Sequence, residues 1–206
     1  MRIETKETSV QLVQALSDGK WAVRWDFKPK PNEEGVYWYE EEIFHHIPTL
    51  EDIQHVIVIW HNKQTDGVIK HGFVWNGISV LLTDENKFNY KAITDEAARR
   101  ETAIAIWDKE HPELAGKNVI FVEGVDEEGN TIQMANPTGR PQSLLPVTLK
   151  LGENNLPENF HTFTTLSELQ DFFSAGVDHL IGAYGAGWYK IATFDWIPYV
   201  EALEQL

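Results

Sequence analysis

The chain has 206 residues, of which 42% are hydrophobic and 12% are aromatic, so it can bury a substantial core. It contains no cysteine, which excludes disulfides, thiolate metal sites and thiol nucleophiles. Its formal net charge of −15, from 32 acidic and 17 basic residues, repels phosphate backbones, and we therefore expect no nucleic-acid partner.

The polar first residues, MRIETKETSVQ, lack the apolar stretch of a signal peptide. No later segment approaches the roughly 18 consecutive apolar residues that a membrane span needs. We therefore expect synthesis in the cytoplasm and no membrane insertion. The local group of basic residues at Lys20, Arg24, Lys28 and Lys30 is interpreted as the polar face and end of a strand.

The first elements are predicted to be a helix and a β-hairpin. Thr8 to Gln11 fit a capping box, and the apolar residues that follow before Gly19 predict a short helix. Residues 21–28 (WAVRWDFK) alternate between apolar and polar, which predicts a half-buried strand. Residues 35–47 (GVYWYEEEIFHHI) predict the second strand of the hairpin. The side chains of the first strand that share its apolar side are Trp21, Val23, Trp25 and Phe27.

A second helix and a second hairpin are predicted next. Pro48 and Thr49 begin a helix, although the β-branched run VIVI leaves a strand open as the alternative. Asn76 and Gly77 supply the positive φ angles of a type I′ turn, so residues 73–82 predict a hairpin with one apolar face. Thr83 is expected to cap the following helix. The apolar side of that helix is predicted to carry Phe88, Tyr90, Ile93 and Ala97.

Residues 98–143 predict another hairpin, in which NVIFVEG and TIQMAN flank a DEEGN turn among polar connectors. Two further strands are predicted at LPVTLKLG and FHTFTT, followed by a capping box at Thr165 to Glu168. The helix that begins there has its predicted apolar face at Leu166, Leu169, Phe173, Val177, Leu180, Tyr184 and Trp188. A terminal helix begins after Asp195, and its predicted inward side chains are Trp196, Val200 and Leu203.

These elements predict an α+β fold of antiparallel β-hairpins packed with several amphipathic helices. We expect one region at residues 1–70, with a helix, a hairpin and a second helix. A second region at residues 71–206 is expected to contain a hairpin-helix unit, the inserted hairpin at about 98–143, and the C-terminal strands and helices. The alternative is that both regions form a single compact domain.

The stretch GVYWYEEE is the candidate ligand-binding site. Tyr37, Trp38 and Tyr39 place aromatic rings on both faces of a strand, and Trp38 is expected to be the most exposed of the eight tryptophans. Glu40 and Glu42 would share one face about 7 Å apart, a spacing within the range that glycosidases use. A solvated or edge-protecting acidic face is the preferred interpretation, and a carboxylate-dependent hydrolase is the minor alternative.

No other motif predicts chemistry. The histidines show no zinc-binding spacing, and the adjacent pair His45 and His46 is interpreted as a strand end, so no metal site is expected. The glycines of GAYGAGW fit neither a dinucleotide fingerprint nor a phosphate loop, and are interpreted as points of close helix packing or of local weakness. DEEGN is a turn rather than a calcium loop, and no serine lies in a nucleophile elbow. We therefore expect no catalytic residue and no cofactor.

The combination of WAVRWDF, YWYEEEIFHHIPTLEDI and GFVWNGISVLLTDENKFNYKA, with LPVTLKLG, FHTFTTLSELQDFF and a terminal DW helix, resembles an uncharacterised family of prophage and phage tail-associated proteins from gut bacteria. Members carry a domain of unknown function that is often encoded beside tail-fibre genes. Shorter members pass from the NYKA helix almost directly to the LPVT strand, so residues 98–143 are extra relative to them. The resemblance implies a structural or assembly role in a phage tail-like particle, with no activity, cofactor or binding residue attached.

Two functions from different classes are therefore expected. The first is a non-enzymatic phage or prophage tail-associated structural or assembly protein, with tail or tail-fibre proteins or a second copy of the chain as partners. Association with the virion belongs to this expectation. The second function is a carbohydrate- or small-ligand-binding module that uses the aromatic and acidic side chains of GVYWYEEE.

Overall fold

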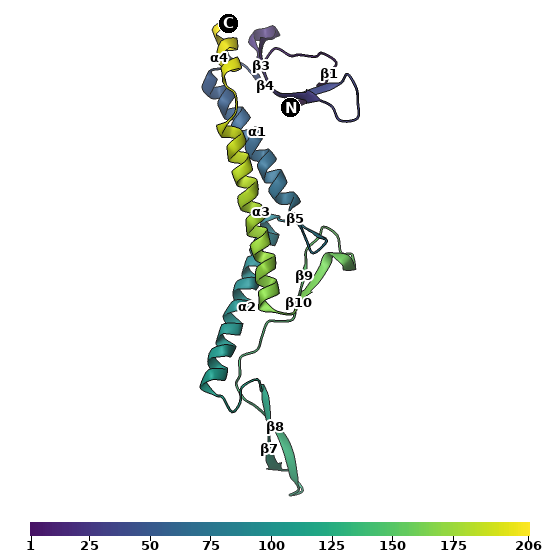
Figure 1. Cartoon of the computed structure of the whole chain (residues 1–206), viewed down its shortest axis with the longest axis vertical. Coiled ribbons are helices and arrows are strands. Elements are labelled where there is room, and N and C mark those ends of the chain that lie inside the picture. Colours follow the sequence, from purple (N-terminus) through teal and green to yellow (C-terminus); the bar gives the residue numbers. More distant parts are fainter. The chain divides into compact units, whose positions relative to one another are not determined.

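The computed structural model describes all residues from 1 to 206, which form ten strands and four α-helices (Figure 1). The strands are β1 (Arg2–Thr5), β2 (Val13–Ala15), β3 (Trp21–Pro29), β4 (Tyr37–Phe44), β5 (Phe73–Trp75), β6 (Ile78–Val80), β7 (Val119–Val125), β8 (Thr131–Pro137), β9 (Val147–Lys150) and β10 (Phe160–Phe163). The helices are α1 (Leu50–His71), α2 (Asp84–Glu110), α3 (Leu166–Ala192) and α4 (Ile197–Glu204). All strand pairs are antiparallel, which confirms the predicted α+β class.

The chain divides into two compact units, and the boundaries between them fall inside long helices. Unit 1 consists of residues 1–67 and 183–206, and unit 2 consists of residues 68–182. The helix α1 therefore begins in unit 1 and ends in unit 2, whereas α3 begins in unit 2 and ends in unit 1.

Unit 1 is built on a four-stranded sheet with the strand order β1-β4-β3-β2. One face of this sheet packs against α1 and α4 through buried side chains. The Tyr199 hydroxyl in α4 donates a hydrogen bond to the backbone carbonyl of Arg24 (2.9 Å), and burial raises the pKa of Tyr199, so the phenol stays neutral. The buried cluster consists of Val13, Val23, Trp25, Ile53, Ile57 and Tyr199.

The predicted helix at residues 8–19 is wrong, because part of this segment forms the edge strand β2. Val13 pairs with Val23 of β3 and is only 1% exposed. A strand is favoured here because it satisfies backbone groups at the edge of β3 that a helix would leave unpaired. Asp18 (φ 64°) and Gly19 (φ 71°) then turn the chain into β3.

The predicted strand at residues 21–28 is confirmed as β3, but its alternation ends at a β-bulge between Trp25 and Lys28. Asp26 has a positive φ of 55° at this bulge. Because the extra residue reverses the faces of the side chains that follow it, Phe27 does not join Trp25 in the core. Phe27 stacks on Tyr37 instead, with ring centroids 5.1 Å apart.

The terminal helix α4 differs from the prediction at two positions. Trp196 and Leu203 pack against the cluster of unit 1, as expected. Val200 is exposed, and the preceding residue, Tyr199, is buried in its place. Asp195 was predicted to cap the helix, but the N-cap position is Trp196, and the Asp195 carboxylate instead accepts a hydrogen bond from the backbone N–H of Ile197 (3.1 Å) just before it.

Within unit 1, α1 and α3 approach each other closely at Thr65 and Gly187. A Cβ atom added to Gly187 would lie 2.2 Å from the hydroxyl oxygen of Thr65. The prediction that these glycines permit close helix packing is therefore confirmed at Gly187. Gly185 has open space around it, so no contact within the chain requires a glycine at that position.

In unit 2, the hairpin predicted around Asn76 and Gly77 is confirmed as β5 and β6. Phe73 pairs with Val80 in the expected register. Asn76 and Gly77 have φ angles of 48° and 81°, as a type I′ turn requires. The hairpin follows α1 after a single residue, Gly72, which adopts the left-handed conformation (φ 73°) just past the end of the helix at His71.

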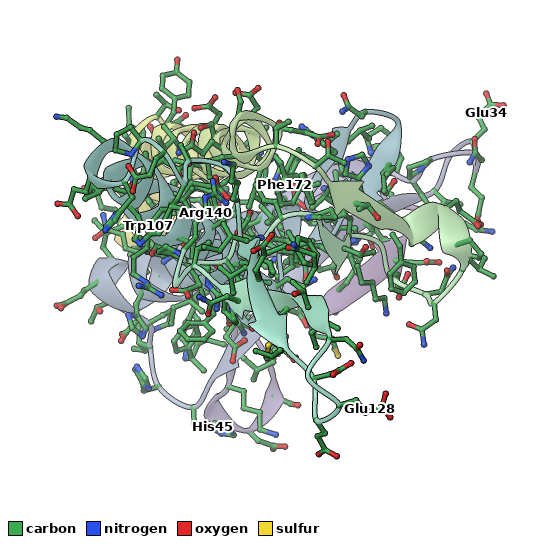
Figure 2. The ribbon with its side chains drawn as sticks, turned by 90° about the horizontal axis from the view of Figure 1, so that it is seen from below. Glu34, His45, Trp107, Glu128, Arg140 and Phe172 are labelled. Atoms are coloured by element: carbon green, nitrogen blue, oxygen red, sulfur yellow. The ribbon has the colours of Figure 1, made fainter.

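Phe172 of α3 lies at the centre of the aromatic core of unit 2 and is 1% exposed (Figure 2). Its ring centroid lies 5.1 Å from that of Tyr90 in α2, 5.2 Å from that of Trp75 in β5, and 5.2 Å from that of Phe163 in β10. Aromatic pairs at such distances attract each other beyond the effect of area burial. One side chain therefore joins α2, α3, the β5–β6 hairpin and the β9–β10 hairpin.

The helix α2 begins as predicted, because the Thr83 hydroxyl accepts a hydrogen bond from the backbone N–H of Asn86 (3.2 Å). Its predicted apolar side is only partly correct. Tyr90 and Ala97 are buried, but Phe88 is 72% exposed. Phe88 and Tyr90 are two residues apart and therefore point to nearly opposite sides of a helix, so both could not face one core.

None of the helices combines the length and the apolar character that crossing a membrane requires.

Replacing Gly72 by alanine is expected to destabilise unit 2 far more than the same change at Gly77. Both glycines have positive φ angles, which cost an alanine about 1–2 kcal/mol. A Cβ atom at Gly72 would also lie 1.6 Å from the carbonyl oxygen of Val80, whereas one at Gly77 would meet nothing within 4 Å. We expect a loss of roughly 3–5 kcal/mol for Gly72→Ala, measured by urea unfolding. Equal losses for the two variants would contradict the close approach.

Candidate functional site

The predicted ligand-binding stretch lies in β4, an inner strand of the unit 1 sheet between β1 and β3. The interpretation of its glutamates as an edge-protecting face is therefore wrong. Tyr39 and Glu40 are each only 8% exposed, and Tyr37 and Trp38 are half-buried. Of the predicted site residues only Glu42 is open to solvent.

The aromatic rings of β4 are already in contact with other side chains of unit 1. Tyr37 stacks on Phe27, as described above. The guanidinium carbon of Arg2 lies 4.6 Å from the centre of the Trp38 ring, and the Lys28 ammonium lies 5.9 Å from it. The expectation that Trp38 is the most exposed tryptophan is wrong, because that residue is Trp188, at 67%.

The carboxylates of β4 are mostly paired. Glu40 accepts from the guanidinium of Arg2 (2.7 Å), and Glu41 accepts from that of Arg24 (2.7 Å). Glu42 has no such partner and lines a shallow cavity of about 370 Å³ beside His55 of α1. Glu40 and Glu42 lie on the same face of the strand, but only one of them is free of an ion pair, so they do not form two available carboxylates. The ligand-binding hypothesis for this strand stays a prediction.

The histidine pair at the end of β4 lies near a single acidic side chain. The His46 ring nitrogen Nε2 is 3.3 Å from the Asp52 carboxylate. The same carboxylate accepts hydrogen bonds from the backbone and the hydroxyl of Thr49, which hold the pKa of Asp52 below its usual range. No group of three histidine or acidic side chains in the protein has the spacing to hold a metal ion.

Six exposed large apolar side chains of unit 2 lie in the hairpin of β7 and β8, called here the β7–β8 ribbon (residues 119–137). Phe121 and Val125 share one face and are 69% and 67% exposed. Because Val122 pairs with Met134, these two side chains lie on the opposite face, where Met134 also covers Gly124. The exposed apolar side chains of the ribbon are Val119, Phe121, Val122, Val125, Ile132 and Met134.

The charges of the ribbon are concentrated at its tip. The turn between the strands contains Asp126, Glu127 and Glu128, and Glu128 lies at the free end of the ribbon in Figure 2. Asp126 closes this turn by accepting from the backbone N–H groups of Glu128 (3.0 Å) and Asn130 (2.8 Å), which confirms the turn predicted at DEEGN. The strand β8 contains no charged residue, so it lacks the charges that usually protect an edge strand.

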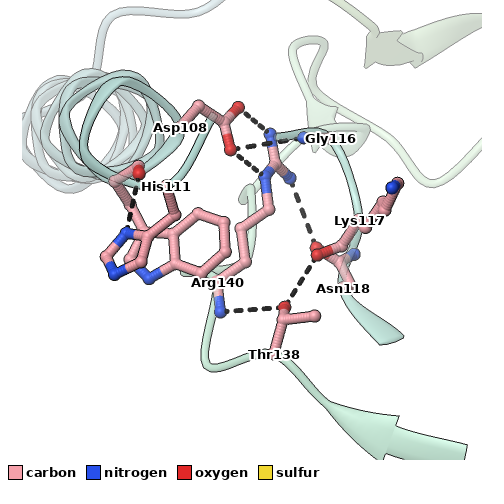
Figure 3. A network of polar contacts seen from close by, with 8 residues as sticks. Asp108, His111, Gly116, Lys117, Asn118, Thr138 and Arg140 are labelled. Atoms are coloured by element: carbon pink, nitrogen blue, oxygen red, sulfur yellow. Dashed lines mark hydrogen bonds and ion pairs between the residues drawn. The ribbon is translucent and has the colours of Figure 1, made fainter. Parts of the chain in front are cut away.

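A polar network fastens the base of the ribbon to the end of α2 (Figure 3). Arg140 donates two hydrogen bonds to Asp108, both at 2.7 Å, in a bidentate arrangement. The Thr138 hydroxyl donates to the carbonyl of Lys117 (2.7 Å), which ties the two strands together below β7. The Arg140 guanidinium and, to a lesser degree, the Gly116 N–H hold the pKa of Asp108 below its usual range.

A second exposed apolar surface lies on α3 within unit 1. It consists of Tyr184, Trp188 and Tyr189 and is called here the α3 aromatic surface. Tyr184 and Trp188 stack with ring centroids 5.9 Å apart, and Trp188 and Tyr189 are 67% and 70% exposed. Tyr184 and Trp188 were predicted to belong to the buried face of α3. This part of the prediction is wrong, because Gly187, and not Trp188, faces α1 here, and both Tyr184 and Trp188 are exposed.

Sequence reasoning did not assign either surface to function. The sequence predicts an ordinary hairpin for the ribbon and a buried face for the aromatic residues of α3. A sequence signal was present in both cases, because Phe121 and Val125 alternate in an isolated hairpin, and residues 183–194 contain no acidic side chain. Comparisons with protein-family models, with curated protein sequences and with solved structures found no match.

Acidification is expected to loosen the ribbon through Asp108. Because the pKa of Asp108 is lower in the folded protein than its unfolded value of about 3.9, the ion pair stabilises the fold fully above that value. The stabilisation is lost as the pH falls through the lowered pKa. Hydrogen-exchange protection of β7 and β8 should therefore be high at neutral pH and decrease as the pH falls below about 4.

The variant Arg140→Met should show low ribbon protection already at neutral pH and a smaller further decrease in acid, which comes from Asp126 in the turn, whose pKa is also lowered by its hydrogen bonds. Arg99→Met is the matched control, because it removes a partner of Glu96, whose pKa is lowered to about 2, on the exposed surface of α2. It should leave the ribbon as in the wild type. The same pH dependence in wild type and Arg140→Met would contradict the role of this network.

Proposed function

We propose that this chain is a non-enzymatic structural or assembly protein of a phage or prophage tail, and that it acts through protein–protein contacts. The observation that supports the contact role is the β7–β8 ribbon, whose apolar side chains are exposed on both faces. The resemblance of the sequence to phage tail-associated proteins supports a phage or prophage tail as the assembly to which the chain belongs. The protein is made in the cytoplasm and joins the virion or the assembling tail.

The ribbon needs a partner for two physical reasons. A two-stranded hairpin is only marginally stable alone in water, and exposed large apolar side chains gain free energy when they are covered. A partner that adds an extended segment to β8 would pair the free backbone groups of this edge and cover one of its faces. A tail or tail-fibre protein with an uncharged apolar segment fits this uncharged edge.

The pairing of the acidic side chains supports the non-enzymatic part of the proposal. A glycosidase needs two carboxylates that can act on a substrate. In β4, the charge of Glu40 is matched by Arg2 and that of Glu41 by Arg24. Buried and paired in this way, Glu40 and Glu41 are engaged within the sheet and are not free to act on a substrate.

A second copy of the chain is the partner proposed for the α3 aromatic surface. The chain carries a net charge of −15, so most of its surfaces repel a second copy. Residues 183–194 carry one lysine and no acidic residue, so contact between two copies here brings no carboxylates together. Exposed Trp and Tyr side chains are also the types that carry most binding energy at protein interfaces.

The double substitution Phe121→Ser and Val125→Thr is expected to weaken binding to the tail or tail-fibre protein encoded beside this chain. Loss of two exposed anchors should reduce affinity by roughly tenfold to a hundredfold, measured by calorimetry on purified proteins. Phe88→Ser is the matched control, because Phe88 is equally exposed (72%) but lies on α2. It should bind as the wild type does.

Two results would overturn this part of the proposal. One is wild-type affinity for the ribbon variant. The other is a wild-type chain that binds none of the neighbouring tail proteins.

Light scattering after size-exclusion chromatography is expected to show a self-associated wild-type chain and a monomeric Trp188→Ser/Tyr189→Ser variant. Both substituted residues are mostly exposed, so the fold should tolerate the changes with stability effects within about 0.5 kcal/mol each. A monomeric wild type at high protein concentration would exclude the second copy as a partner.

A further inference from the structure

Unit 2 contains an apolar cavity of about 180 Å³ between the β5–β6 hairpin, the first half of α2 and the first half of α3. The side chains that matter for its shape and chemistry are Phe73, Leu82, Tyr90, Phe172, Gly176 and Val177. An apolar cavity of about 150 Å³ is large enough to bind benzene in an engineered protein. This cavity can therefore hold one six-membered ring or a branched alkyl group of similar size.

The walls of the cavity present almost no polar atoms. Tyr90 is the only hydroxyl-bearing residue among them, and its O–H donates to the backbone carbonyl of Lys150 (3.0 Å) outside the cavity. Burial raises the pKa of Tyr90 to about 12, so it remains a neutral donor committed to that bond. The ring of Tyr90 and the edge of Phe172 are left to contact an apolar ligand.

Gly176 creates part of this space. It is buried in the middle of α3, where glycine is less favourable than alanine. A Cβ atom at Gly176 would lie 3.5 Å from the Phe73 ring and 4.0 Å from Leu82, which are ordinary contact distances. Packing therefore does not require a glycine here, and a larger side chain at this position would occupy the cavity.

Two lysines of α2 lie at the cavity, and each of them is paired with an aspartate. Lys87 and Lys91 lie one turn apart on α2 and both line the cavity. Lys87 pairs with Asp84 (2.7 Å) and Lys91 pairs with Asp95, but the side chains of both aspartates are mostly exposed, at 83% and 62%. Exposed ion pairs of this kind are weak, so another carboxylate can replace them.

We propose that this cavity binds a small organic anion with an aromatic or branched alkyl body and a carboxylate. The body fills the apolar space against Phe172 and Gly176, and the carboxylate is held between Lys87 and Lys91. This site is separate from the contact surfaces of the proposed function, so either proposal can fail without the other.

A titration of the full chain with 3-phenylpropanoate, followed by ¹H–¹⁵N NMR, tests the proposal. Saturable shifts are expected at the backbone amides around Phe73, Tyr90 and Gly176. The neutral analogue 3-phenylpropanol should bind several-fold more weakly, because it lacks the charge that the lysines recognise. Absence of saturable binding, shifts confined to other residues, or equal affinity for acid and alcohol would each overturn the proposal.

Variants separate the two halves of the site. Gly176→Leu should reduce affinity for both compounds by about tenfold or more, because its side chain fills the cavity. Gly185→Leu is the matched control, because it lies on α3 in open space, and it should bind as the wild type does. The double variant Lys87→Met/Lys91→Met should reduce affinity for the acid roughly threefold to tenfold and leave affinity for the alcohol unchanged.

Gly176→Ala provides a second test if the leucine variant does not fold. Its added methyl group makes only ordinary contacts, so the fold is retained while the cavity shrinks. Affinity should fall measurably, and unchanged affinity would contradict the placement of the ligand beside Gly176.

Discussion

The packing of Phe172 against its neighbouring aromatic rings is the contact on which unit 2 depends. It holds Tyr90 and therefore the first half of α2, and it holds Trp75 and Phe163 of two hairpins that are far apart in sequence. The far end of α2 carries the β7–β8 ribbon, so the ribbon is positioned by a core that it does not touch. The apolar cavity lies beside these rings, between Phe172 and Gly176 of α3 and the side chains of α2.

The sequence was sufficient to predict element types where a period or a turn motif was long enough to be recognised. The hairpin at Asn76 and Gly77 and the capped start of α2 are examples, because both signals lie within a few residues. The strand β2 could not be recognised, because three residues show no period and their strand conformation depends on pairing with β3. The β-bulge at Asp26 has no sequence signal either, and for this reason the alternating pattern predicts the wrong face of the sheet for Phe27.

The candidate site was harder to predict than the fold, because exposure depends on contacts between distant parts of the chain. The aromatic rings of β4 predict a ligand-binding platform, but the guanidinium of Arg2 covers the Trp38 ring. Arg2 lies in another strand, and a local sequence pattern cannot reveal that contact. Conversely, Trp188 fits an amphipathic face, yet it is 67% exposed, because that face of α3 is not covered near Trp188. Helical periodicity predicts which residues share a face, and the tertiary fold decides whether that face is covered.

The ion pair between Asp108 and Arg140 has a consequence for how this chain can change. The two residues are 32 positions apart in the sequence. Their contact returns the chain to the end of α2 after it has formed the ribbon. Residues 109–139 therefore form a loop whose two ends are held together by this ion pair. Removal or replacement of this loop would leave the aromatic core of unit 2 intact. The protein is therefore modular at this point, and a new recognition element could be exchanged into the same position without redesign of the remaining fold.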